Sequence, residues 1–125
     1  MLALLVATLL SQATWYDHYE RGVRLIEEGQ AAAARPELEA ALKLREKEGL
    51  QLPARPQQYV DYLPHLYLAI ASQMTGDLDV ARRELASAET SGIATRSEVG
   101  HPLLVAYQLL LRGNADSRRG SMGCG

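Results

Sequence analysis

The chain has 125 residues, a formal net charge of −2, 22% charged residues, no Phe and one Cys. This length fits a single domain with a modest core, and an aromatic content of 6% suits closely packed helices better than a β-sandwich. The charge balance leaves no basic footprint for nucleic acid and no polybasic patch for a membrane surface, so neither partner class is expected.

Residues 1–13 combine an apolar run with a segment of small residues. Residues 2–10 are almost wholly apolar, and Ser11-Gln12-Ala13 supplies the small-x-Ala pattern of a cleavage site. The run is too short to cross a bilayer, which needs about 20 apolar residues, so no stable membrane span is expected. We interpret 1–13 as a signal peptide cleaved after Ala13, which implies a periplasmic or extracellular protein. The alternative is a helix of the domain that packs its apolar side inward.

Two helices are expected between residues 14 and 48. Thr14 is a suitable N-cap, and apolar residues recur after it at spacings of three and four as far as Ile26. Gly29 can adopt the left-handed conformation that closes a helix, so it predicts a turn. The following helix contains Pro36, which is well tolerated only in a first turn. That helix is therefore expected to start late or to bend.

A connection and a second helical pair follow. Residues 49–56 contain Gly and two Pro and are expected to form the connection. Residues 57–75 predict a helix whose regular part begins near Pro64, with 59–63 as an extra turn or lead-in. Gly76 predicts the next turn, and the helix after it is expected to stop at Ser91-Gly92.

One more helix is expected near the C-terminus. Residues 93–99 predict a polar linker, and residues 101–112 are strongly apolar. Because this helix is apolar nearly all round, we expect it to cap the domain or to dock a second copy of the chain, giving a homodimer. Residues 113–125 are short, polar and rich in Gly and Ser, so they are expected to form a disordered tail.

The strongest pattern in the chain is an internal repeat with an offset of 47 residues. Starting at Gly29 and again at Gly76, the sequence reads Gly, four residues, Ala-Arg-x-Glu-Leu, two residues, Ala. The same offset relates His18 to His65 and Gly22 to Ala69. Self-similarity at a fixed period is the sequence signature of stacked structural repeats.

These residues resemble the tetratricopeptide repeat (TPR) family, chiefly its exported bacterial members. Leu68-Ala69 stands in the family's Leu-Gly position, Gly76 in its turn, and Ala81 with Leu85 in its Ala and Phe positions. The corresponding places in the first copy are held by Gly22, Leu25, Gly29, Ala34 and Leu38. The chain departs from the pattern in its long period, which we attribute to an insertion at about 47–58, in its missing closing Pro, and in having His where the family has a large aromatic residue. The resemblance implies an all-α fold, with about two and a half helix-turn-helix repeats over 14–112.

The resemblance also implies a binding function. In TPR arrays the first helix of each repeat lines a concave groove, which can accept a helical or extended segment of a protein partner. We therefore expect a non-catalytic adaptor or scaffold. The alternative is a structural N-terminal fragment of a longer multidomain protein, self-associating through 101–112. Carried over position by position, the groove candidates are Tyr16, Tyr19, Val23, Ile26, Leu63, Leu66, Ile70, Gln73 and Met74.

No catalytic, cofactor-binding or metal-binding pattern is recognisable, so no enzyme activity and no cofactor are expected. His18 and His65 share a repeat position and lack the spacing of metal ligands, which favours a packing role. Glu37 and Glu84 also share a position, expected on the exposed face and without a paired carboxylate. Cys124 is the only cysteine and cannot form an intrachain disulfide.

Overall fold

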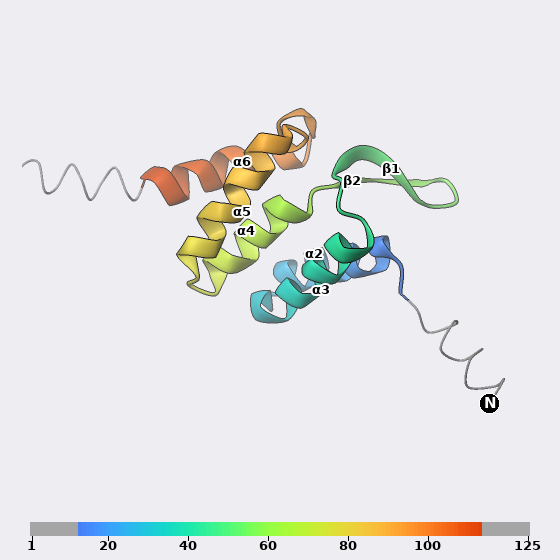
Figure 1. Cartoon of the computed structure of the whole chain (residues 1–125), viewed down its shortest axis with the longest axis horizontal. Helices are drawn as coiled ribbons and strands as arrows, with labels where there is room; N and C mark the ends of the chain where they lie inside the picture. Colours follow the sequence, from blue (N-terminus) through green and yellow to red (C-terminus); the bar gives the residue numbers. More distant parts are fainter. Residues whose placement is uncertain (1–12, 114–125) are drawn as a thin grey trace, which may run out of the picture.

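The computed structural model describes residues 13–113, which are mostly helical and include a small two-stranded sheet (Figure 1). Apart from Ala13 and Gly113, the expected signal peptide (1–13) and tail (113–125) lie outside the described residues. The elements in chain order are α2 Trp15–Glu27, α3 Ala31–Leu44, β1 Gly49–Arg55, β2 Gln58–Tyr62, α4 Pro64–Met74, α5 Leu78–Ser91, the 3₁₀ helix η1 Ala94–Arg96, α6 Gly100–Gln108 and the π-helical turn η2 Leu109–Gly113.

The first helix pair, α2 and α3, forms because its ends are well specified. Thr14 is the predicted N-cap and forms a capping box with Asp17, in which each side chain accepts a hydrogen bond from the backbone of the other residue. Gly29 has φ +81°, as the predicted turn requires. Helix α3 starts at Ala31 and continues through Pro36, so the expectation of a late start is wrong.

The insertion between the two pairs is an antiparallel β-hairpin, so the expected connection at 49–56 and the extra turn or lead-in expected at 59–63 are strands instead. Strands β1 and β2 pair with register irregularities, and Gln51 and Gln57 have left-handed φ values of 50° and 63°. Tyr62, at the end of β2, is fully buried and donates a hydrogen bond to the carbonyl of Arg45 over 2.6 Å. The hairpin is therefore anchored to the helices at its base.

The second helix pair repeats the design of the first. Helix α4 begins at Pro64, as predicted, because Pro is tolerated in a first turn. The turn at Gly76 has φ +83°, and α5 ends at Gly92 with φ +72°. The side chain of Asp77 caps α5 and also accepts a hydrogen bond from Arg35 of α3 over 3.3 Å. This ion pair joins the two helix pairs.

The expected polar linker, residues 93–99, contains a short 3₁₀ helix, and two of its residues, Ala94 and Ser97, are buried while four others are exposed. Ala94 is fully buried in η1, and Ser97 is buried with its hydroxyl donating to Asp61 over 2.7 Å and accepting from the backbone N–H of Gly100 over 2.9 Å. This arrangement starts α6 next to the base of the hairpin. The missing side chain at Gly100 is also required, since a Cβ there would lie 2.5 Å from Leu63.

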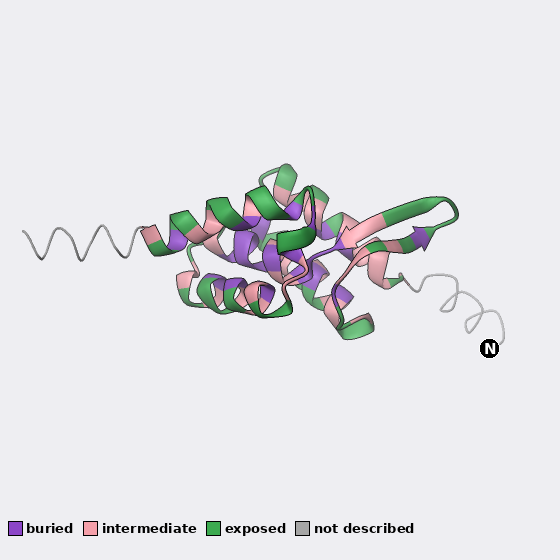
Figure 2. Cartoon of the chain, turned by 90° about the horizontal axis from the view of Figure 1, so that it is seen from above, coloured by how far each residue is buried: buried purple, intermediate pink, exposed green. Residues whose placement is uncertain are grey.

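The helices stack in chain order. Helix α4 packs against α3 of the first pair, against its own partner α5, and against α6. Buried residues gather along the middle of the stack, and the hairpin projects from one end (Figure 2). The predominance of helix agrees with the all-α expectation, whereas the sheet was not expected.

Candidate functional site

Three of the expected groove residues lie in the core instead. Leu66 and Ile70 of α4, and Leu63 just before this helix, are almost fully buried. They belong to one cluster with Leu104 of α6 and Leu111 of η2. Helix α6 therefore covers this face of α4. The expectation that these three side chains line an open groove is wrong, because a partner could reach them only if α6 moved.

Two further candidates, Tyr16 and Tyr19, hold the hairpin. The buried hydroxyl of Tyr19 donates to the carbonyl of Asp61 over 2.8 Å and accepts from the N–H of Leu63 over 3.2 Å, and burial raises the pKa of Tyr19 well above 10. The guanidinium of Arg55 in β1 lies 5.3 Å from the ring centroid of Tyr16. These tyrosines position the hairpin against α2.

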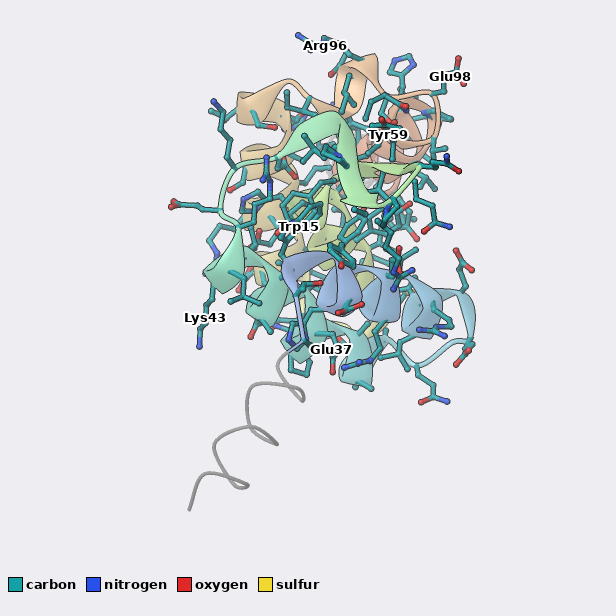
Figure 3. All side chains as sticks on the ribbon, turned by 90° about the vertical axis from the view of Figure 1, so that its right-hand side faces the viewer. Trp15, Glu37, Lys43, Tyr59, Arg96 and Glu98 are labelled. Carbon is teal, nitrogen blue, oxygen red and sulfur yellow. The ribbon has the colours of Figure 1, made fainter. Side chains whose placement is uncertain are left out.

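The same contact region includes Trp15, the first residue of α2, which lies beside the hairpin (Figure 3). Its ring meets that of Tyr62 edge to face, at a centroid distance of 4.8 Å, and the guanidinium of Arg45 lies 5.2 Å from it. Arg55 also pairs with Asp17 over 3.0 Å and with Glu20 over 3.1 Å. The hairpin thus closes one end of the α2 surface.

The remaining four candidates are partly exposed. Val23 and Gln73 are half-buried, Ile26 packs against all three hydrophobic clusters, and Met74 is 43% exposed. Of these four, Val23 lines a groove.

This groove, which we call the α2–α4 groove, lies between the first helices of the two pairs and has a volume of about 360 Å³. Tyr67, from α4, was not among the expected residues, yet it forms the opposite wall. Burial raises the pKa of Tyr67, and the negative charges of Glu27 and Asp61 raise it further. The groove is lined by Tyr19, Glu20, Val23, Arg24, Glu27 and Tyr67.

Two residues of α2 that line this groove, Glu20 and Glu27, have repeat equivalents on α4, of which Tyr67 lines the groove as well. Tyr67 lies 47 positions after Glu20, and Met74 lies 47 positions after Glu27, so equivalent positions of α2 and α4 carry different chemistry. Tyr67 and Met74 are also seven apart and share one helix face. The position-by-position comparison with the family selected Met74 on this face but not Tyr67, and its other candidates from Leu66 to Gln73 lie on neighbouring faces of α4.

The histidine and the glutamate that recur at the 47-residue offset contact each other in both helix pairs. Nδ1 of His18 lies 2.8 Å from Oε2 of Glu37, and Nδ1 of His65 lies 2.7 Å from Oε2 of Glu84. Each contact joins the first helix of a pair to the second. The packing role expected for the histidines agrees with this geometry, but the sequence analysis placed the two glutamates alone on an exposed face.

A larger cavity of about 780 Å³ lies beside α5, on the side reached by the segment that leaves α3. Its polar wall includes Glu48, which is only 7% exposed and accepts hydrogen bonds from the hydroxyl of Ser91 and the backbone N–H of His65. Burial raises the pKa of Glu48. Because His65 lies in the first turn of α4, this carboxylate caps that helix.

The outer face of α6 and η2 is apolar and exposed. Val105, Leu109 and Leu110 all expose a large part of their side chains, and Leu109 is 68% exposed. This is the face expected to dock a second copy of the chain, and that docking stays a prediction.

The described part of the chain, residues 13–113, contains neither a metal-ligand cluster nor a helix suited to span a membrane. No group of three or more His, Cys, Asp or Glu side chains there is placed to hold a metal ion. Within the same range, no helix has both the length and the hydropathy needed to cross a membrane.

Comparisons with known proteins add no identification. No protein-family model, no curated protein and no solved structure matches the chain. The functional argument therefore depends on the geometry of the chain itself.

Proposed function

We propose that the chain is a TPR-like repeat protein. Three observations support this: the 47-residue offset, the left-handed glycine in the turn of each pair, and the packing of each new first helix on the preceding pair. The hairpin between the pairs accounts for the unusually long period. Neither the comparisons nor the sheet adds support, so the proposal depends on the repeat and the stacking.

We further propose that the chain is a non-catalytic module that binds a helical or extended segment of a protein partner in the α2–α4 groove. The observation that carries this proposal is that Tyr67 and Val23, both half-buried, line this groove between the first helices of the two pairs. Interfaces combine an apolar or aromatic centre with a polar rim, and Glu20, Arg24 and Glu27 supply such a rim.

The size and charge of the groove define what it would accept. A volume of about 360 Å³ fits one or two side chains of a partner rather than a whole folded surface. Glu20 is already paired with Arg55, and Arg24 and Glu27 carry opposite charges. The groove therefore favours an apolar or aromatic anchor residue, and its charges set orientation more than affinity.

The test is a selection of displayed peptides on the purified chain, followed by affinity measurements with variants. We expect the selected peptides to carry an apolar or aromatic anchor residue. Their affinity for the Val23→Glu variant should be at least about tenfold lower than for wild type, a difference of about 1.4 kcal/mol in binding free energy. Glu27→Lys should change affinity in the same direction by less, since it lies at the rim. The matched control is Glu39→Lys on α3, an equally exposed glutamate outside the groove.

Two results would contradict the proposal. One is a selection in which no peptide is enriched more strongly on this chain than on a helical control protein that lacks such a groove. The other is a set of peptides that bind wild type, Val23→Glu and Glu39→Lys equally well, because such peptides would recognise another surface.

A further inference from the structure

Helix α6 corresponds to α4 at an offset of 36 residues. This offset aligns the first residues of the two helices and places His101 at the position of His65. It also aligns Leu68 with Leu104, each of which is 3% exposed. Helix α4 packs on α2 and α3, and α6 packs in the same way on α4 and α5 (Figure 1). Helix α6 therefore takes the place of the first helix of a third pair.

In each of the first two pairs, the second helix covers one face of the first. On α4 this face includes Ala69, which is fully buried in one cluster with residues of α5. On α2 the equivalent residue is Gly22, where a Cβ would lie 2.7 Å from a side-chain atom of Leu38 of α3. Leu66 and Ile70, beside Ala69, are buried as well. The second helix thus lies directly on this face in both pairs.

The equivalent face of α6 is open. The residues that take the positions of Leu66, Ala69 and Ile70 are Pro102, Val105 and Ala106, and all three are exposed. Leu109, on the same side of the helix, is 68% exposed. We call Pro102, Val105, Ala106 and Leu109 the α6 face.

Exposed apolar side chains gather around this face. Within the described part of the chain seven large hydrophobic side chains are exposed, and four of them lie between residues 99 and 110. Such a concentration marks an interaction surface, whereas single exposed apolar residues do not. The α6 face therefore has the character of a contact that another helix completes.

The two existing pairs indicate what kind of helix would fit. Helices α3 and α5 each present Ala, Leu and Ala at spacings of four and three, and these side chains are almost fully buried against the first helix. Residues 114–125 contain three Gly, no Leu, Ile or Val, and no apolar residues at spacings of three or four. Their sequence therefore does not provide such an apolar face.

The same pairs indicate the charge of that helix. In each pair a Glu of the second helix contacts the His of the first, over 2.8 Å for His18 and Glu37 and over 2.7 Å for His65 and Glu84. His101 holds the equivalent position in α6 and is exposed, and it contacts no carboxylate among residues 13–113. The α6 face thus combines an uncharged, apolar centre with a His at one end.

We propose that the α6 face binds an amphipathic helix of a partner protein, which takes the place of a second helix and completes a third pair. The partner helix presents apolar residues at spacings of three and four to Val105, Ala106 and Leu109, and an Asp or Glu to His101. A second copy of the chain fits less well, because residues 100–113 contain no Asp or Glu to meet His101. The site is separate from the α2–α4 groove, since none of its residues lines that groove.

The test is a selection of helices displayed on phage, with the purified full chain as target. The library has the sequence of α5, with apolar residues varied at the positions of Ala81, Leu85 and Ala88 and all amino acids allowed at the position of Glu84. We expect Asp or Glu to be enriched at that last position by at least about threefold over the starting library, as suits an exposed ion pair.

Variants of the chain then locate the bound helix. Affinity for a selected helix should fall at least about tenfold with Leu109→Lys, which places a charge in the apolar centre. Leu44→Lys, at an exposed Leu of α3, is the matched control and should leave the affinity unchanged. His101→Gln should weaken binding of an acidic selected helix more than binding of its Gln counterpart. Val23→Glu should have no effect, so this result and the result for the α2–α4 groove are distinguishable.

Four results would overturn the proposal. A selection that enriches no helix would remove the site, and enrichment without Asp or Glu opposite His101 would remove the proposed chemistry. Binding that survives Leu109→Lys would place the helix on another surface. Sedimentation showing a wild-type dimer that Leu109→Lys converts into a folded monomer would mean that a second copy of the chain covers this face.

Discussion

Single side chains hold each helix pair together through contacts that recur at the repeat offset. The His18–Glu37 and His65–Glu84 contacts have nearly the same length and join equivalent helices. The sequence showed that these residues shared positions, but it could not show that a His and a Glu 19 residues apart would meet. That depends on how two helices are rotated about their axes, which side-chain packing decides and a one-dimensional pattern does not.

The His65–Glu84 contact should make stability depend on pH. The hydrogen bond to Glu84 raises the pKa of His65, against the opposing effect of burial and with help from the negative charges of Glu48, Glu84 and Glu46. A raised pKa means that the contribution is complete below the unfolded-state pKa of about 6.5 and is lost as pH rises through the folded-state pKa. We expect the difference in free energy of unfolding between wild type and His65→Gln to shrink as the pH rises above about 6.5.

Urea unfolding at several pH values measures that difference. His101→Gln, at an exposed position in the first turn of α6, is the control substitution. A difference for His65→Gln that stays constant over the whole range would refute the assignment.

Element ends were predictable from sequence, whereas the element between the pairs was not. Thr14, Gly29, Pro64 and Gly76 mark helix ends by local chemistry, and the helices start or stop there. The hairpin gave no such signal, because its left-handed positions are occupied by Gln51 and Gln57 instead of Gly or Asn. Its contacts with α2 hold it in place, so tertiary packing outweighs local preference here.

Tyr62 is the residue of the hairpin on which this packing depends most. It is fully buried, and its hydroxyl donates to the carbonyl of Arg45 over 2.6 Å. Tyr62→Phe should lower the free energy of unfolding by about 1 kcal/mol, because it leaves that carbonyl without its donor. Tyr59→Phe, at a position of β2 that is 61% exposed, should change it by less than about 0.5 kcal/mol.

Urea unfolding of the two variants side by side compares a buried and an exposed hydroxyl in one strand. Equal effects of the two substitutions would mean that the base of the hairpin contributes no more to stability than its surface does.

At the scale of the whole molecule, the repeat predicted two equivalent helix pairs, and the apolar run at 101–112 predicted the helix that follows them. It did not predict which face of α4 would remain open. Leu66 and Ile70 are covered by α6, while Tyr67 and Met74 are not fully covered. The family pattern specifies the first helices, but the apolar composition of α6 decides how far it covers its neighbour, and that depends on packing in three dimensions.

The measurement that tests partner binding most directly is amide chemical-shift mapping of the ¹⁵N-labelled chain during titration with a selected peptide. We predict that the largest shift changes fall on the α2–α4 groove, at Val23, Glu27 and Tyr67, and extend to Met74. Largest changes at Val105 and Leu109 on the exposed face of α6 and η2, with none in the groove, would contradict the account and place recognition on that face instead.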